Sequence, residues 1–201
     1  MPRTRMIFSK RGRICFVPHV EMPTLFCRAF RRAGLRIELS SGLSPHPRIS
    51  LGPALPVGVP AMGEPLEVWV DRWDRDIERS VDGTLPEGIR ILRSGMVDGR
   101  PKLSGECEAA LYRIIFREGS AIERLGKLVS GGWKPVEQTL ALDVRRNWLD
   151  AAVSSPGQVG AGTMIKRFAA EGIIGSWSDV LVARLAVGGW SGESIQPLPC
   201  C

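Results

Sequence analysis

Two histidines, His19 and His46, are the only imidazoles in the chain, and each can supply acid–base chemistry near neutral pH. His46 lies between Pro45 and Pro47 in the segment SSGLSPHPRIS, directly before Arg48. Because Pro47 favours an extended backbone at His46 and Pro45 fixes its own φ, the imidazole is held at low entropic cost. An imidazole beside a guanidinium suits phosphate or nucleic-acid binding, or acid–base chemistry on a phosphodiester.

Positive charge is concentrated in the first quarter of the chain. Residues 1–48 contain ten Lys or Arg and two acids, a net charge of +8, whereas the remainder has 17 basic and 19 acidic residues. The net charge of +6 for the whole chain is therefore carried by residues 1–48. Such asymmetry is typical of a protein with an anionic partner, most often nucleic acid, and a basic surface kept only for solubility is the alternative.

The first helix is expected to present arginines on its polar side. Apolar residues recur at i, i+3, i+4, i+7, i+8 and i+11 from Met22, which predicts an amphipathic helix over 20–33. Arg28, Arg31 and Arg32 are three and four residues apart and therefore share a face of this helix. Arg31 and Arg32 also complement the negative end of the helix, which gives them a purely structural reason to be there.

The order of the expected elements predicts an α+β fold with two tandem ferredoxin-like (split βαβ) halves and antiparallel sheets. Residues 1–95 form the first half, 96–107 a polar linker, and 108–201 the second half with a C-terminal tail. The expected strands of the first half are 3–9, a short return strand 14–17, 35–40, 66–70 and 89–94, and the helices are 20–33 and 74–81. The expected strands of the second half are 110–117, 139–145, 148–153 and 180–187, and the helices are 120–129 and 163–170.

Cofactor motifs are absent from the sequence. The five cysteines show neither a C-x-x-C pair nor ligand spacing, so reduced thiols are expected and no metal site. Because no G-x-G-x-x-G, P-loop, H-E-x-x-H or radical-SAM C-x-x-x-C-x-x-C motif is present, we expect no cofactor. No apolar run is long enough for a membrane helix, and no apolar segment of the kind found in signal peptides follows the basic N-terminus. We therefore expect a cytoplasmic protein without a membrane partner. The adjacent Cys200 and Cys201 would suit redox chemistry or metal binding, but no further ligand lies near them.

Residues 8–59 carry five ordered motifs: FSK with Gly12, FVPHVEM, RAFRRAGL, SSGLSPHPRIS and LPVGV. Together they resemble the radical-SAM-linked family, a domain of unknown function (DUF2344-like) typically encoded beside, or fused behind, a radical-SAM protein. The resemblance implies a radical-SAM protein as partner. Pro18, Glu21 and Leu43-Ser44 depart from the family pattern of Ser, Asp and Phe-Asn. The matching positions are Ser9, Lys10, His19, Glu21, Arg28, Arg32, Gly42, Pro45, His46, Pro47 and Arg48.

We expect these residues to form one cluster. In a split βαβ fold, the connection after the first helix can fold back beside the start of that helix. His19, His46 and Arg48 would then meet the arginine face, although a capping role is the structural alternative for His19. The expected anion or RNA contacts are Lys10, Arg11, Arg13, Arg28, Arg32 and Arg48, with a loop shaped by Gly42, Pro45, His46 and Pro47.

Three functions are compatible with this cluster. The first is an accessory protein that works with a radical-SAM partner and binds RNA or another anionic substrate through the basic face. The second is a metal-independent endoribonuclease in which His19 or His46 is the general acid or base, by architectural similarity to CRISPR repeat-processing enzymes. The third is a scaffold whose Pro-His-Pro loop only supports the sheet.

Overall fold

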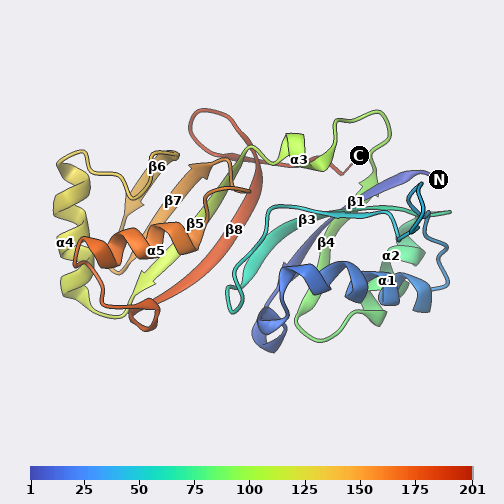
Figure 1. Cartoon of the computed structure of the whole chain (residues 1–201), viewed down its shortest axis with the longest axis horizontal. Coiled ribbons are helices and arrows are strands. Elements are labelled where there is room, and N and C mark those ends of the chain that lie inside the picture. Colours follow the sequence, from blue (N-terminus) through green and yellow to red (C-terminus); the bar gives the residue numbers. More distant parts are fainter. Residues whose placement is uncertain (201) are drawn as a thin grey trace. The chain divides into compact units, whose positions relative to one another are not determined.

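The computed structural model describes residues 1–200 and has a mixed α+β fold with antiparallel sheets, as predicted (Figure 1). The chain divides into two compact units, the first formed by residues 1–106 with 198–200 and the second by Cys107–Pro197. The division thus falls inside the segment predicted as a linker, which also contains the short helix α3 (Leu103–Glu106). None of the helices in residues 1–200 combines the length and apolar character needed to cross a membrane.

The first unit contains an antiparallel sheet in the order β4-β1-β3, with β2 also paired to β3. In chain order its elements are β1 (Arg3–Lys10), the 3₁₀ helices η1 (Gly12–Phe16) and η2 (His19–Glu21), α1 (Met22–Arg32), β2 (Ile49–Leu51), β3 (Ala61–Trp69), α2 (Arg75–Thr84) and β4 (Ile89–Met96).

Two short strands predicted in this unit are wrong. The segment 14–17 lies largely in η1, where the Val17 N–H donates to the Ile14 carbonyl at 3.0 Å instead of pairing with β1. The segment 35–40 forms only single bridges, and the strand that pairs with β3 is β2, further along the chain. Leu39 is 51% exposed, so the 35–40 segment has no continuous buried face to fix a longer ladder.

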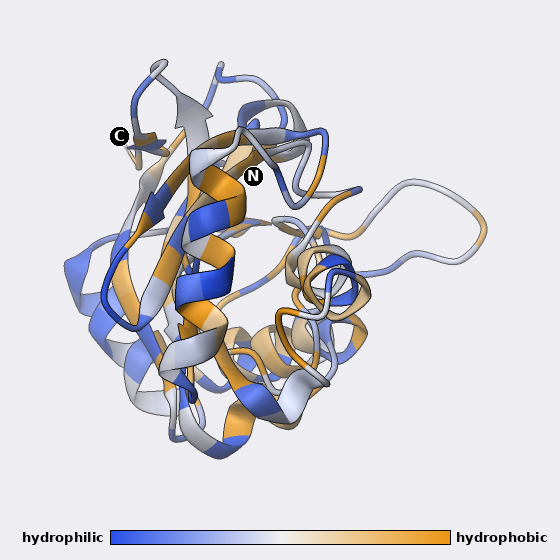
Figure 2. Ribbon diagram, turned by 90° about the vertical axis from the view of Figure 1, so that its left-hand side faces the viewer, coloured by the Kyte–Doolittle hydropathy of each residue, from blue (hydrophilic) through white to orange (hydrophobic). Residues whose placement is uncertain are grey.

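Helix α1 folds as its apolar stripe predicts. Pro23 lies in its first turn, and Gly34, with φ +76°, follows its end. The buried side of α1 packs with α2 on the sheet, and Phe26 meets Phe8 of β1 edge-on at 4.9 Å between ring centroids. Figure 2 shows hydrophobic and hydrophilic residues alternating along the helices, as amphipathic packing requires.

The opposite face of this sheet carries a buried network of charged side chains. Arg5 of β1 is fully buried and donates through Nε and Nη2 to Glu67 Oε1 at 3.0 and 2.6 Å. Its guanidinium also bonds to Glu106 of α3 and, at 3.1 Å, to the Pro199 carbonyl. The C-terminal residues, predicted as a tail of the second half, therefore lie in the first unit because Arg5 binds their backbone and Leu198 is buried.

The second unit repeats the order of the first. Its sheet runs β8-β5-β7-β6, with β9 on β8, and all of these pairs are antiparallel. The rings of Phe116 and Phe168 lie 5.9 Å apart and join β5 to α5 in the core. Its elements are β5 (Ala109–Phe116), α4 (Gly119–Ser130), β6 (Thr139–Val144), β7 (Trp148–Ser154), α5 (Ala161–Ala170), η3 (Trp177–Asp179), β8 (Val180–Trp190) and β9 (Ile195–Pro197).

Candidate nucleic-acid interface

Three adjoining cavities of the first unit extend from the turn into η1 to the exposed side of α1, and we refer to them together as the basic groove. The first cavity, about 870 Å³, is lined by Arg11 and Arg13 of the turn into η1. The second, about 590 Å³, is lined by Arg28 and Arg32. The third, about 380 Å³, is lined by Arg28 and Arg31.

The three cavities adjoin one another because they share lining residues. Ile14, Val17 and Pro86 line both the first and the second cavity. Thr24 and Arg28 line both the second and the third. The three cavities are therefore neighbours on the surface of the first unit.

The arginines of the basic groove are exposed, and Arg32 donates a long hydrogen bond to the Thr84 carbonyl at 3.5 Å. Among residues 1–200, no carboxylate forms an ion pair with any of the five, Arg11, Arg13, Arg28, Arg31 and Arg32. By contrast, Arg79 and Arg90, exposed in the same unit, are paired with Asp76 and Asp82 at 2.9 and 3.1 Å. Unpaired guanidinium groups keep their donors available for phosphate oxygens.

Two carboxylates also line the basic groove. Glu21 borders the second cavity, and Glu87 borders the first. Both are exposed and make no ion pair among residues 1–200. Five arginines against two acids leave the groove with a positive balance.

His46 lies in the third cavity beside Arg28 and Arg31, where the predicted fold-back of the loop would bring it. Its Nδ1 is 2.9 Å from Ser40 Oγ, and its backbone N–H donates to the same hydroxyl at 3.1 Å. The Ser40 N–H in turn donates to the His46 carbonyl at 2.8 Å. These bonds hold the ring through Nδ1 and leave Nε2 without a hydrogen-bond partner in the described part of the chain.

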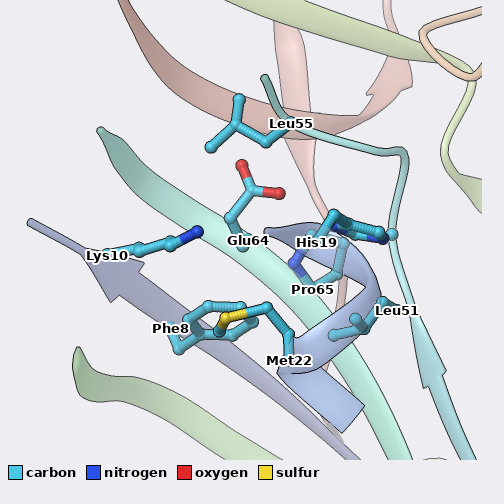
Figure 3. Close-up of a pocket in the computed structure, with 9 residues that line it drawn as sticks. Phe8, Lys10, His19, Met22, Leu51, Leu55, Glu64 and Pro65 are labelled. Carbon is cyan, nitrogen blue, oxygen red and sulfur yellow. The ribbon is translucent and has the colours of Figure 1, made fainter. Parts of the chain in front are cut away.

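His19 occupies a different place from the predicted cluster. It borders a cavity of about 10 Å³ together with Lys10 and Glu64, and Figure 3 shows the three side chains around this space. Lys10 and Glu64 are 4% and 5% exposed, and Lys10 Nζ donates to the Val17 carbonyl at 2.7 Å. A cavity of this size holds about one water molecule, so it does not admit a substrate.

Arg48 is engaged on the other side of the loop. Its guanidinium pairs with Glu38 and lies over the ring of Trp69, 4.1 Å from the centroid. Hydrogen bonds from the amino group of Met1 and from Arg48 lower the pKa of Glu38. Arg48 therefore ties the base of the loop to β3, and it does not line the basic groove.

The structure thus brings together only part of the predicted set. Four of the six predicted anion contacts line the basic groove with His46, whereas Lys10, His19 and Arg48 lie elsewhere. Of the loop residues, Pro47 lines the third cavity, and Gly42 has a φ of +136° that favours glycine.

Two residues of the basic groove were absent from the expected anion contacts. Arg31 was predicted on the same helix face as Arg28, but its position at the helix end already gave it a structural role. Phe16 carried no signal in the sequence, because an apolar residue after a basic turn reads as part of the core.

The thiols contribute little to this surface. Cys15, Cys27, Cys107 and Cys200 are buried and form no disulfide, and burial raises the pKa of the Cys15 thiol. Of these four, Cys27 borders the basic groove. Cys201, the other half of the terminal pair, lies outside the described residues.

These features define a two-unit α+β protein with an arginine-lined groove on its first unit. The chain belongs to the DUF2344 family, described as an uncharacterized protein conserved in bacteria, and the match covers residues 3–154. The predicted family resemblance is therefore confirmed, and the radical-SAM linkage stays a prediction. No curated protein matches the chain.

Similarity to solved structures is weak. A crystal structure of an unknown protein from Galdieria sulphuraria has 15% identity and a TM-score of 0.30, covering 91% of this chain and 96% of that one. The acetolactate synthase small subunit from Thermotoga maritima has 17% identity and a TM-score of 0.26, covering 95% and 99%. At such TM-scores neither similarity assigns a fold or a function.

Proposed function

We propose that the protein binds RNA through the basic groove and serves as an accessory to a radical-SAM protein. The observation that supports the RNA-binding part is the set of three adjoining cavities with five exposed arginines, none of which forms an ion pair within residues 1–200. Contacts of this kind go to phosphates, which position an RNA strand without reading its sequence.

Tandem ferredoxin-like halves are part of the proposal. The paired order is β4-β1-β3-β2 in the first unit and β8-β5-β7-β6 in the second. Numbered within each unit, both orders are 4-1-3-2. That order, with a helix after the first and third strands, supports the split βαβ arrangement. In this reading the basic groove belongs to the first half only.

The direct test replaces two groove arginines. We expect Arg28→Ala with Arg31→Ala to weaken binding of a labelled single-stranded RNA at least tenfold, because each removes a charge-assisted contact. The matched control is Arg79→Ala with Arg90→Ala, which removes the same charge from arginines that are already paired. Equal effects of the two double variants would reduce the groove to a general basic surface and contradict the proposal.

The radical-SAM partner is supported by the family resemblance alone. We expect the tagged protein to co-elute with the radical-SAM protein encoded beside its gene, in the presence or absence of RNA. Failure to co-elute under both conditions would remove the partner and leave RNA binding intact.

An endoribonuclease is the second candidate, and one observation favours His46 as its acid or base. His46 lines the third cavity together with Arg28 and Arg31, a combination that suits proton transfer beside a phosphodiester. His19, in contrast, borders a cavity with room for about one water molecule. The test is metal-free cleavage of structured RNA. Cleavage that is abolished by His46→Ala and retained in His19→Ala would establish this activity. If the wild type cleaves no RNA, the endoribonuclease is excluded and the accessory role is kept.

A further inference from the structure

The basic groove contains the phenyl ring of Phe16. Of the six phenylalanines, five are at most 3% exposed, whereas Phe16 is 70% exposed. Phe16 is the last residue of η1 and lines the second cavity with Arg28 and Arg32. The hydrophobic core of the first unit therefore does not use this ring.

The backbone on both sides of Phe16 is fixed. The Gly58 N–H donates to the Cys15 carbonyl at 2.9 Å, and Lys10 Nζ donates to the Val17 carbonyl at 2.7 Å. Because both neighbours of Phe16 are held by buried or distant parts of the chain, the ring has a rigid support. A rigid aromatic surface loses little conformational entropy when a ligand stacks on it.

The second cavity combines this ring with positive charge. Its volume of about 590 Å³ is in the range of pockets that hold a small organic ligand such as a nucleotide. Leu25 and Leu85 add apolar walls, and Arg28 and Arg32 add guanidinium groups. An aromatic face beside arginines is the arrangement with which proteins stack an unpaired base and hold the adjoining phosphate.

We propose that Phe16 stacks on an unpaired base of RNA while Arg28 and Arg32 hold the flanking phosphates, so that the basic groove selects single-stranded over double-stranded RNA. This inference rests on the proposed function and names its substrate class. In a duplex, each base face is covered by the neighbouring base, and only the backbone is left for the arginines.

The test measures binding of three labelled probes of about 12 nucleotides, a length within the range of single-strand binding sites. The probes are a mixed-sequence RNA strand, the same strand in a blunt duplex, and an abasic strand with the same phosphates. We expect Phe16→Ala to weaken binding of the mixed-sequence strand about 5- to 150-fold and Phe16→Trp to preserve it. For the duplex and the abasic strand, Phe16→Ala should change affinity less than twofold.

The control variant is Leu92→Ala, which removes an exposed apolar side chain of β4 that lines none of the three cavities. Unfolding midpoints of both alanine variants show whether the fold is retained. The stacking inference alone is overturned if Arg28→Ala weakens binding and Phe16→Ala does not. Equal affinity for the strand and the duplex would also overturn it. No binding of any probe at low salt overturns the proposed function with it.

Discussion

At the scale of single residues, His46 and Arg48 are near neighbours in the Pro-His-Pro loop but make different contacts. His46 lines the basic groove, whereas Arg48 two residues later pairs with Glu38 and covers Trp69. In a regular strand, residues two apart would point to the same side. The regular strand begins only at Ile49, so the packing of the loop against α1 and β3 decides where each side chain points.

This separation predicts different consequences for the two residues. We expect Arg48→Ala to lower the free energy of unfolding by about 0.5–1 kcal/mol, because a partly exposed cation–π contact with Trp69 is lost. RNA affinity should change less than twofold. His46→Ala should do the reverse, weakening RNA binding several-fold with little change in the unfolding midpoint. Denaturant titration and binding assays on both variants check the pair, and a stability loss confined to His46→Ala would support the scaffold reading instead.

At the scale of elements, the basic turn between β1 and η1 is fixed by a close backbone contact. The Arg11 N–H donates to the Gly88 carbonyl at 2.8 Å. A Cβ at Gly88 would lie 2.2 Å from the Arg11 carbonyl oxygen, and Gly88 has a φ of +93°. Glycine is therefore required here both by the conformation and by the space.

We expect Gly88→Ala to destabilise the protein by more than about 1 kcal/mol and to weaken RNA binding, because it moves Arg11 within the groove. Gly99→Ala is the matched control, since Gly99 has a φ of +80° but no atom within 4 Å of the position that a Cβ would take. Urea unfolding of the two variants isolates the steric contact. Equal destabilisation by both would attribute the effect to backbone conformation alone.

The sequence predicted the helices better than the connections. The apolar stripe from Met22 gave α1 to within two residues of its start, because burial of one face fixes the helical period. The strand expected over 35–40 was wrong, because β-like alternation does not say which of two nearby segments pairs with β3. The basic groove was predicted in part. The excess of basic residues in 1–48 indicated its place in the chain, but the burial of Lys10 and the exposure of Phe16 depend on tertiary packing.

At the scale of the whole molecule, one buried arginine organises the first unit. Arg5 joins β1 to β3 through Glu67, to α3 through Glu106, and to the C-terminal residues through the Pro199 carbonyl. Burial disfavours its charge, but hydrogen bonds to Glu106 and Glu67 outweigh this and raise the pKa of Arg5. Removing one partner of such a group leaves the others buried without compensation, which costs about 3–5 kcal/mol.

The same network predicts a dependence of stability on acid. Burial raises the pKa of Glu106, but hydrogen bonds from Arg5 and Arg100 outweigh it, so the pKa lies below its ordinary value of 4.5. A lowered pKa in the folded state means that the stabilisation is complete above about pH 4.5 and is lost as the pH falls through the folded-state value. Thermal unfolding of wild type and Glu106→Gln should therefore differ by a constant amount above that pH and converge below it. A difference that grows on acidification would contradict the assignment.

The measurement that tests the central claim most directly is the salt dependence of RNA binding. If the five groove arginines each neutralise one phosphate of a single strand, the logarithm of the association constant should fall against the logarithm of salt concentration with a slope of about −3.5. Arg28→Ala should make this slope shallower by about 0.7. A wild-type slope near zero, or a slope and affinity that Arg28→Ala leaves unchanged, would contradict RNA binding by the basic groove.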